Sequence, residues 1–157
     1  MTAFDLDRFL PYRLNLLAHR ASRGFAAYYR DAHGLNNAEW RVLAHLSQAP
    51  SVSVRDIQHR TELEKSTVSR AVTRLEARGQ VQKTVDPDDH RLCTLTLTAD
   101  GKRLMRRLSA AAARYQAEAL AALTPAQHRN LDQVLTALTD TAALDHEPPA
   151  RARRVTP

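Results

Sequence analysis

The chain of 157 residues is long enough for one domain with an apolar core, and 43% of its residues are hydrophobic. Its 23 Lys and Arg against 17 Asp and Glu give a formal charge of +6, which suits a polyanionic partner without proving one. A single cysteine excludes an intrachain disulfide framework. The sequence shows no membrane-length apolar run and no signal-peptide core, so we expect a cytoplasmic protein.

Two helices are predicted before residue 50. In the first, apolar residues recur at intervals of three and four: Leu10, Leu14, Leu17, Ala21, Phe25 and Tyr28. Pro11 is compatible with this helix only in its opening turn, because proline has no N–H to donate. Asn37 is predicted to cap the second helix, residues 38–47, which Pro50 helps to close.

A helix-turn-helix is predicted next. Ser53 can cap a short helix that runs to about Arg60, with Asp56 as the second member of a capping box. Residues 61–64 make the turn, and the helix that follows has a clear packing face when wound at 3.6 residues per turn. That face consists of Val68, Ala71, Val72 and Leu75. In such a unit the first helix supports the second.

The opposite face of the second helix suits DNA. Serine and threonine reach phosphates or either base edge, and arginine can contact guanine in a bidentate manner. The predicted DNA contacts are Lys65, Ser66, Thr67, Ser69, Arg70, Thr73 and Arg74. Any amphipathic surface helix also offers a polar stripe, so this pattern alone leaves both interpretations open.

A β-hairpin with a charged tip is predicted after the turn at Gly79. Residues 81–85 and 92–98 are both strand-like, the second through alternating leucine and threonine. Arg91, in the tip, could enter an adjacent minor groove, where the negative potential favours arginine. Asp89 is better suited to accept hydrogen bonds from Arg91 or from turn amides, and so to fix the shape of the wing.

Four segments of this region carry a family resemblance: 66–70, 75–79, 86–91 and 97–101. The most specific feature is an aspartate, one residue and an arginine, followed by a strand that ends in Leu-Thr and then a glycine. These are Asp89, Arg91, Leu97, Thr98 and Gly101. The chain closely resembles the MarR family of bacterial transcription regulators, over nearly its whole length. The resemblance implies a homodimer whose reading helices and wings grip a pseudo-palindromic operator in double-stranded DNA, usually as a repressor released by a small ligand.

The predicted fold is therefore mainly α with a small β-hairpin wing. Residues 36–101 are assigned to the winged helix-turn-helix, which binds DNA, and residues 1–35 and 102–145 to a helical dimerisation region. Residues 146–157, which include Arg151, Arg153 and Arg154, are assigned to a disordered tail.

The dimerisation region is predicted to contain two further helices. One follows Gly101; the other is capped by Thr124, starts with Pro125 and continues to about Ala143. Their apolar stripes fit an intrachain core or a dimer interface, and the resemblance favours the interface.

The resemblance also implies a small effector, often an aromatic carboxylate or a phenol, between the dimerisation helices and the reading domain. The first helix carries a polar and aromatic stripe that includes Tyr12 and Asn15. Arginines on this helix can meet a carboxylate, and an aromatic residue on the second helix can form a pocket wall. The predicted ligand contacts are Arg13, His19, Arg20, Arg23 and Trp40. The alternatives are solvated side chains and, for Trp40, a core position.

Enzyme motifs are not apparent: there is no phosphate-cradling glycine loop and no nucleophile elbow. We predict no enzyme, no catalytic residue, no cofactor and no metal site, although scattered histidines can converge in space. Cys93 lies outside the amino-terminal helix in which the family's peroxide sensors carry their reactive cysteine, so a packed or idle thiol is expected. Two alternatives stay open: a DNA-binding protein that needs no ligand, and a helical interaction module with an incidental basic surface.

Overall fold

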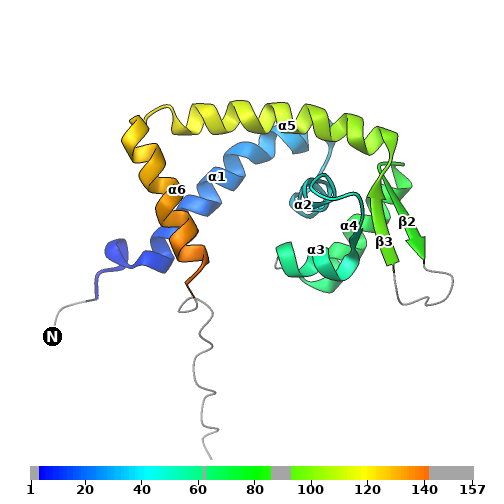
Figure 1. Ribbon diagram of the computed structural model, residues 1–157, viewed down its shortest axis with the longest axis horizontal. Helices are drawn as coiled ribbons and strands as arrows, with labels where there is room; N and C mark the ends of the chain where they lie inside the picture. The colour runs from blue at the N-terminus through cyan, green and yellow to red at the C-terminus, as the bar shows by residue number, and fades with distance from the viewer. Residues whose placement is uncertain (1–3, 62, 86–92, 142–157) are drawn as a thin grey trace, which may run out of the picture. The chain divides into compact units, whose positions relative to one another are not determined.

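The computed structural model describes residues 4–61, 63–85 and 93–141, and it is mainly helical with one small sheet (Figure 1). The elements in chain order are η1 (Leu6–Arg8), α1 (Leu10–His33), α2 (Asn37–Leu46), β1 (Val52–Ser53), α3 (Val54–Thr61), α4 (Lys65–Ala77), β2 (Val81–Val85), β3 (Cys93–Leu97), α5 (Ala99–Leu120) and α6 (Pro125–Thr139). Contacts within the chain divide it into two compact units, Met1–Tyr115 and Gln116–Pro157. These units are defined by contacts, whereas the regions predicted from the sequence are defined by role. The predicted division into a DNA-binding region and a dimerisation region therefore stays a prediction.

The sheet is antiparallel, in the order β1-β3-β2. The predicted hairpin is present, with Val81 opposite Leu97 and Val85 opposite Cys93. Its second strand ends one residue earlier than predicted, at Leu97, and Leu92 lies outside the described residues. Strand β1 was missed because a two-residue strand shows no periodicity; Val52 pairs with Leu95.

The core of the first unit forms where α4, α2, α3 and the sheet meet. The predicted packing face of α4 is confirmed, since Val68, Ala71, Val72 and Leu75 are all buried. Helix α2 adds Val42 and Leu43, α3 adds Ile57 and β3 adds Leu95. Burial of these aliphatic side chains holds α4 by one face and leaves the other face accessible.

The prediction that Asn37 caps α2 was wrong by one residue. Asn36 is the N-cap: its Oδ1 accepts from the Glu39 amide at 2.9 Å, and the Glu39 carboxylate accepts from the Asn36 amide at 2.9 Å. Glutamate stands three residues after Asn36, whereas tryptophan stands three residues after Asn37, so only Asn36 can form a capping box. The helix accordingly spans Asn37–Leu46 instead of 38–47.

The predicted capping box of α3 is confirmed. The Ser53 hydroxyl accepts from the Asp56 amide at 3.0 Å, and Asp56 Oδ2 accepts from the Ser53 amide at 3.2 Å. The helix runs one residue beyond Arg60, because the Thr61 hydroxyl donates to the Ile57 carbonyl at 2.7 Å.

Helix α5 starts at Ala99, three residues before the predicted start at residue 102. Gly101 lies in its first turn, where a Cβ atom would overlap the Gln80 carbonyl oxygen. Further along, the Tyr115 hydroxyl donates to the Ala21 carbonyl of α1 at 2.8 Å, beside Gly24. Gly101 therefore lets α5 approach the Gln80 backbone closely, and Gly24 lets α1 approach Tyr115 of α5.

In the second unit, Thr124 caps α6 and Pro125 opens it, as predicted, and Gln127 completes a capping box with Thr124. The helix ends at Thr139 rather than near Ala143, which lies outside the described residues, as does the predicted tail. None of the α6 residues is buried within the single chain. Over the described ranges, no helix is both long and apolar enough to cross a membrane.

Candidate nucleic-acid interface

Helix α4 presents a polar face away from the core. Its predicted DNA contacts lie on this face: Thr67 is half-buried, and the exposed residues are Lys65, Ser66, Ser69, Arg70, Thr73 and Arg74. The structure thus gathers seven of the nine predicted DNA contacts on one helix. The other two, Asp89 and Arg91, lie outside the described residues.

The side chains of this face are held by weak contacts within the helix. Arg70 Nε donates to the Ser66 carbonyl at 3.2 Å, and its Nη2 lies 3.5 Å from the Thr67 hydroxyl. The Thr73 hydroxyl donates to the Ser69 carbonyl at 3.1 Å. Because these contacts are solvent-exposed, the groups can exchange them for phosphate or base contacts at little cost.

The start of α4 favours an anion. Its first turn holds no acidic residue, and the N-cap Glu64 makes no side-chain capping bond. The first amide N–H groups of a helix have no partner within it, and the helix dipole is positive there. A DNA phosphate is a suitable acceptor for these amides.

Glu39 of α2 positions α4, a role that sequence reasoning missed. Its carboxylate is buried, with 1% of the side chain exposed, and receives Arg78 at 3.4 Å and Arg74 at 3.7 Å. The two arginines keep 41% and 60% of their side chains exposed. Glu39 therefore fixes the second half of α4 against α2 while both guanidinium groups remain accessible. The capping box marks Glu39 in the sequence, but its distant partners carry no local signal.

Helix α3 is also tied to α2. Arg41 Nη1 donates to the Thr61 carbonyl at 2.8 Å and so satisfies the last turn of α3. Burial lowers the pKa of His45 below its ordinary value of 6.5, and the charges of Arg60 and Arg41 lower it further. At the other end of α3, the hydrogen bonds from Ser53 lower the pKa of Asp56 and favour its charged, capping form.

Two of the predicted ligand contacts lie together. Arg13 and Arg20 line a hollow of about 250 Å³ formed by η1 and α1, together with Tyr12, Leu16 and the acidic Asp7, but His19 and Arg23 are exposed and do not line it. Trp40 is half-buried and packs against the core.

Trp40 belongs to an aromatic cluster formed by α1, α2 and α5. Its ring is stacked on Tyr29, with ring centroids 5.9 Å apart, and meets the edge of Phe25 at 5.0 Å. Phe25 also lies 5.6 Å from Tyr115. Burial raises the pKa of Tyr29. The cluster fills the junction of these helices with side chains.

Outside the polar face of α4, the described part of the chain holds one cysteine and no metal-binding group of side chains. Cys93 is a free, half-buried thiol on β3. Among the residues that the structure describes, no three His, Cys, Asp or Glu side chains come together in a way that could hold a metal ion.

A helix-turn-helix beside a small antiparallel sheet, joined to long flanking helices, defines the class of winged helix-turn-helix proteins. Sequence comparison is specific: the MarR family model matches residues 33–92. The transcriptional repressor Mb2911 of Mycobacterium bovis is 30% identical over 105 residues, which are 67% of this chain and 76% of that protein. The chain belongs to the MarR family of transcription regulators.

Solved structures agree with this assignment. A MarR/EmrR family regulator from Acinetobacter sp. ADP1 superposes with a TM-score of 0.78 and 27% identity, over 90% of this chain and 99% of that one. BpsR of Bordetella bronchiseptica, whose DNA binding is regulated by 6-hydroxynicotinic acid, gives 0.76 and 25%, over 88% and 98%. Two other curated relatives, YdgJ of Bacillus subtilis and the homoprotocatechuate degradative operon repressor of Escherichia coli, are matched over 62% and 66% of their own length.

Proposed function

We propose that this protein is a homodimeric DNA-binding repressor that recognises a pseudo-palindromic operator and is released by a small aromatic acid or phenol. The exposed hydroxyls and arginines of α4, opposite its buried face, carry the DNA-binding part of the proposal. An α-helix fits the major groove, where these side chains can contact bases and phosphates. Residues 36–101 are then the DNA-binding region, with the unseen Asp89 and Arg91 in its wing.

Exposed apolar side chains support the dimer. They occur in two separate places, at the start of the chain and on α6: Phe4, Leu6, Phe9, Leu10, Leu16, Leu17, Val134 and Leu135. Soluble monomers rarely expose such clusters, and a second copy of the same helices would cover them. A dimer also supplies the two linked reading helices that a two-part operator requires.

The effector part of the proposal is supported by the cations of α1 and by one relative. Arg13 and Arg20 share a hollow on α1, and arginine pairs readily with carboxylate. 6-Hydroxynicotinic acid, which regulates DNA binding by BpsR, is a hydroxylated aromatic acid and so belongs to the class of ligand proposed here. A dimer partner would have to complete the site, because the hollow is small and open.

Selection of bound duplexes from a random DNA pool, at near-physiological salt, tests the proposal. We expect a pseudo-palindrome with half-sites about one helical turn, ~10 base pairs, apart. Affinity for the selected duplex should fall steeply with salt, because phosphate contacts release counterions. Recovery of no sequence above background would contradict operator recognition.

A further inference from the structure

Helix α5 has a strongly cationic exposed face within the first unit. Five basic residues occur between positions 102 and 114, and all five are exposed: Lys102, Arg103, Arg106, Arg107 and Arg114. At about 100° per residue they fall within an arc of about 140°, opposite the buried Leu104 and Leu108. The stretch 102–114 contains no acidic residue. We refer to these five residues as the α5 basic face.

The charge of the α5 basic face is only partly neutralised. Arg103 pairs with Asp100, in the turn of the helix before it. Over the described ranges, no carboxylate lies within ion-pair distance of the other four cations. Lys102 and Arg106 are four residues apart, as are Arg103 and Arg107, and like charges at this spacing destabilise a helix. A bound polyanion would offset this repulsion.

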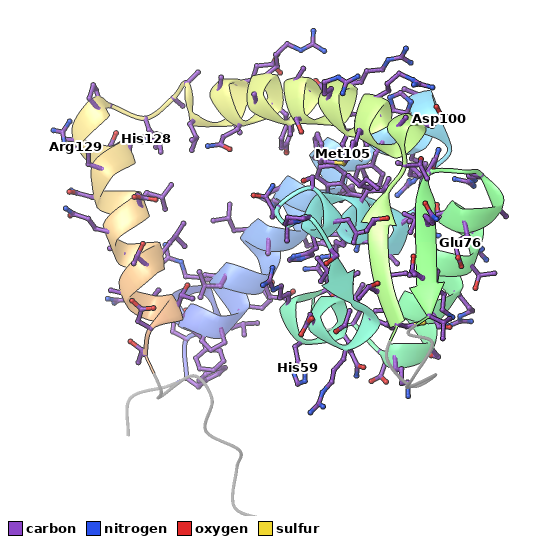
Figure 2. The ribbon with its side chains drawn as sticks, turned by 45° about the vertical axis from the view of Figure 1, so that its right-hand side comes forward. His59, Glu76, Asp100, Met105, His128 and Arg129 are labelled. Atoms are coloured by element: carbon purple, nitrogen blue, oxygen red, sulfur yellow. The ribbon has the colours of Figure 1, made fainter. Side chains whose placement is uncertain are left out.

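The α5 basic face and the polar face of α4 lie on opposite sides of the first unit. Both helices turn their buried side chains toward one core, which includes Met105 of α5 and Val68 of α4. Figure 1 shows α2 between α5 and the helix-turn-helix. Figure 2 shows Met105 on the core side of α5 and His59 of α3 on the far side of the unit. A duplex bound along α4 therefore does not cover the α5 basic face.

We propose that the α5 basic face binds the phosphate backbone of a second DNA duplex without reading its sequence. Four of its five cations are arginines, which can donate two parallel N–H groups to a phosphate. From Lys102 to Arg114 the helix rises about 18 Å, at about 1.5 Å per residue. Duplex DNA presents about ten phosphates over that length, at one charge per about 1.7 Å. The α5 basic face can therefore contact several phosphates at once.

The exposed side chains between the cations favour DNA over other anionic partners. They are small: Ser109, Ala110 and Ala113. A stable protein interface has an apolar or aromatic centre, and a helix that lies on a membrane inserts large apolar side chains. The α5 basic face provides neither, whereas phosphate contacts depend mainly on charge. A flat cationic surface of this kind fits a DNA backbone.

DNA on both faces would hold two duplexes together. Operator binding through α4 would fix the protein at one site, and the α5 basic face would retain a second segment of any sequence. This joining of two duplexes rests on the proposed function, whereas phosphate binding by α5 does not.

Fluorescence anisotropy of a labelled duplex of random sequence tests phosphate binding with the full-length protein. The starting point is a variant in which α4 has lost three cations, through Lys65→Gln, Arg70→Gln and Arg74→Gln, so that the remaining binding reports on other surfaces. We expect this α4 variant to keep measurable binding at about 50 mM salt. The binding should weaken as salt is raised, because phosphate contacts release counterions.

Further substitutions locate the remaining binding. The substitutions Lys102→Gln, Arg106→Gln and Arg107→Gln, added to the α4 variant, should weaken its DNA binding at least about tenfold. They should also reduce the slope of log affinity against log salt by about three, one for each lost phosphate contact. A defect of folding alone would not change the slope in this proportion, and thermal unfolding verifies the fold of each variant.

A matched control removes the same charge from other elements. It adds Arg8→Gln, Arg30→Gln and Arg129→Gln, at exposed positions of η1, α1 and α6, and should keep the affinity and slope of the α4 variant. Equal weakening by the control and by the α5 substitutions, or loss of all binding in the α4 variant, would overturn the proposal. Poly-glutamate that binds the α5 basic face as tightly as the duplex does would also overturn it, because the partner would then be an acidic protein.

Operator DNA distinguishes failure of the two proposals. Wild-type protein held on an immobilised operator, once duplex selection has supplied one, should retain a labelled duplex of random sequence. The three α5 substitutions alone should leave operator affinity unchanged and abolish this retention; an equal loss of operator affinity would place α5 on the same duplex and contradict the inference. Random-duplex binding that depends on α5, in a protein that selects no operator, supports the inference and contradicts the proposed function. A selected operator without α5-dependent binding gives the reverse conclusion.

Discussion

Arg70 is a predicted DNA contact whose side chain is available for binding. Its guanidinium lies along α4, held at 3.2 Å by a backbone carbonyl and at 3.5 Å by a hydroxyl. No buried carboxylate competes for it among its described contacts, in contrast to Arg74, which faces Glu39. Arg70 is therefore the better candidate for a base edge, and Arg74 for a fixed phosphate contact.

Arg70→Ala should weaken operator binding by about 1–3 kcal/mol and relax the preference at one base position. Arg107→Ala removes an exposed arginine of α5 and serves as the control for loss of charge. Dissociation constants for the operator and a set of single-base variants, at one salt concentration, measure both effects. Equal weakening for every duplex would instead make Arg70 a phosphate contact.

Glu39 is the residue on which the placement of α4 depends. Glu39→Ala should lower the free energy of unfolding by about 1–3 kcal/mol, because it removes the capping partner of Asn36 and the ion pairs to Arg74 and Arg78. Glu39→Gln keeps a capping group but loses the charge. Urea unfolding should therefore place Glu39→Gln between the wild type and Glu39→Ala. If Glu39→Gln matched the wild type, the ion pairs would contribute nothing to stability.

Helix ends show how far local sequence determines the elements. The boxes at Ser53 and Thr124 were predictable because both partners lie within four residues. The cap of α2 was misplaced by one residue because two asparagines are adjacent, and only the Glu39 partner decides between them. Strand β1 has no signal of its own; it forms because β3 offers it a pairing edge.

Helices α2 and α3 should show a pH-dependent stability that originates in His45. Its folded pKa is lowered by burial and by nearby arginines, so the unfolded chain takes up the proton first as the pH falls. Stability is then complete above pH 6.5, the ordinary value, and decreases below it. His45→Gln should reduce the fall in Tm between pH 7.5 and pH 5.5. Parallel pH curves for the two proteins would contradict this origin.

At the scale of the whole molecule, the exposed apolar residues are the basis of the homodimer proposal. Leu17 has 61% of its surface exposed, although it belongs to a regular apolar stripe. A single exposed leucine is common on the surface of a monomer, but a group of exposed apolar residues is not. Leu17 belongs to such a group. In the proposed homodimer, the second copy of the chain would bury these side chains.

Leu17→Glu should dissociate the dimer. Loss of about 1.5–3 kcal/mol for each buried leucine, in two symmetric copies, raises the dissociation constant more than tenfold. Light scattering over a dilution series measures the change, and operator affinity should fall with it. Gln133→Glu, an exposed substitution on α6, controls for the added charge. An unchanged mass for Leu17→Glu would place the interface elsewhere.

Only part of the candidate DNA-binding site could be predicted from the sequence. The polar face of α4 follows from helical period alone, and the structure presents it as predicted. The partners of Glu39, Arg74 and Arg78, come from a segment that is distant in sequence. Periodicity reports only which face of an element is apolar, so it cannot identify such pairings.

The base of the wing has a consequence for how this protein can diversify. The Thr98 hydroxyl donates to the Gly79 carbonyl at 2.6 Å and accepts from the Gly101 amide at 3.1 Å, so the end of α4 and the start of α5 are joined directly. These bonds do not involve the residues between Val85 and Cys93. If the wing contacts DNA as proposed, changes between these two residues alter the surface that meets the DNA and leave the bonds of Thr98 in place. New operator preferences could then evolve in this segment without a matching change in the anchoring residues.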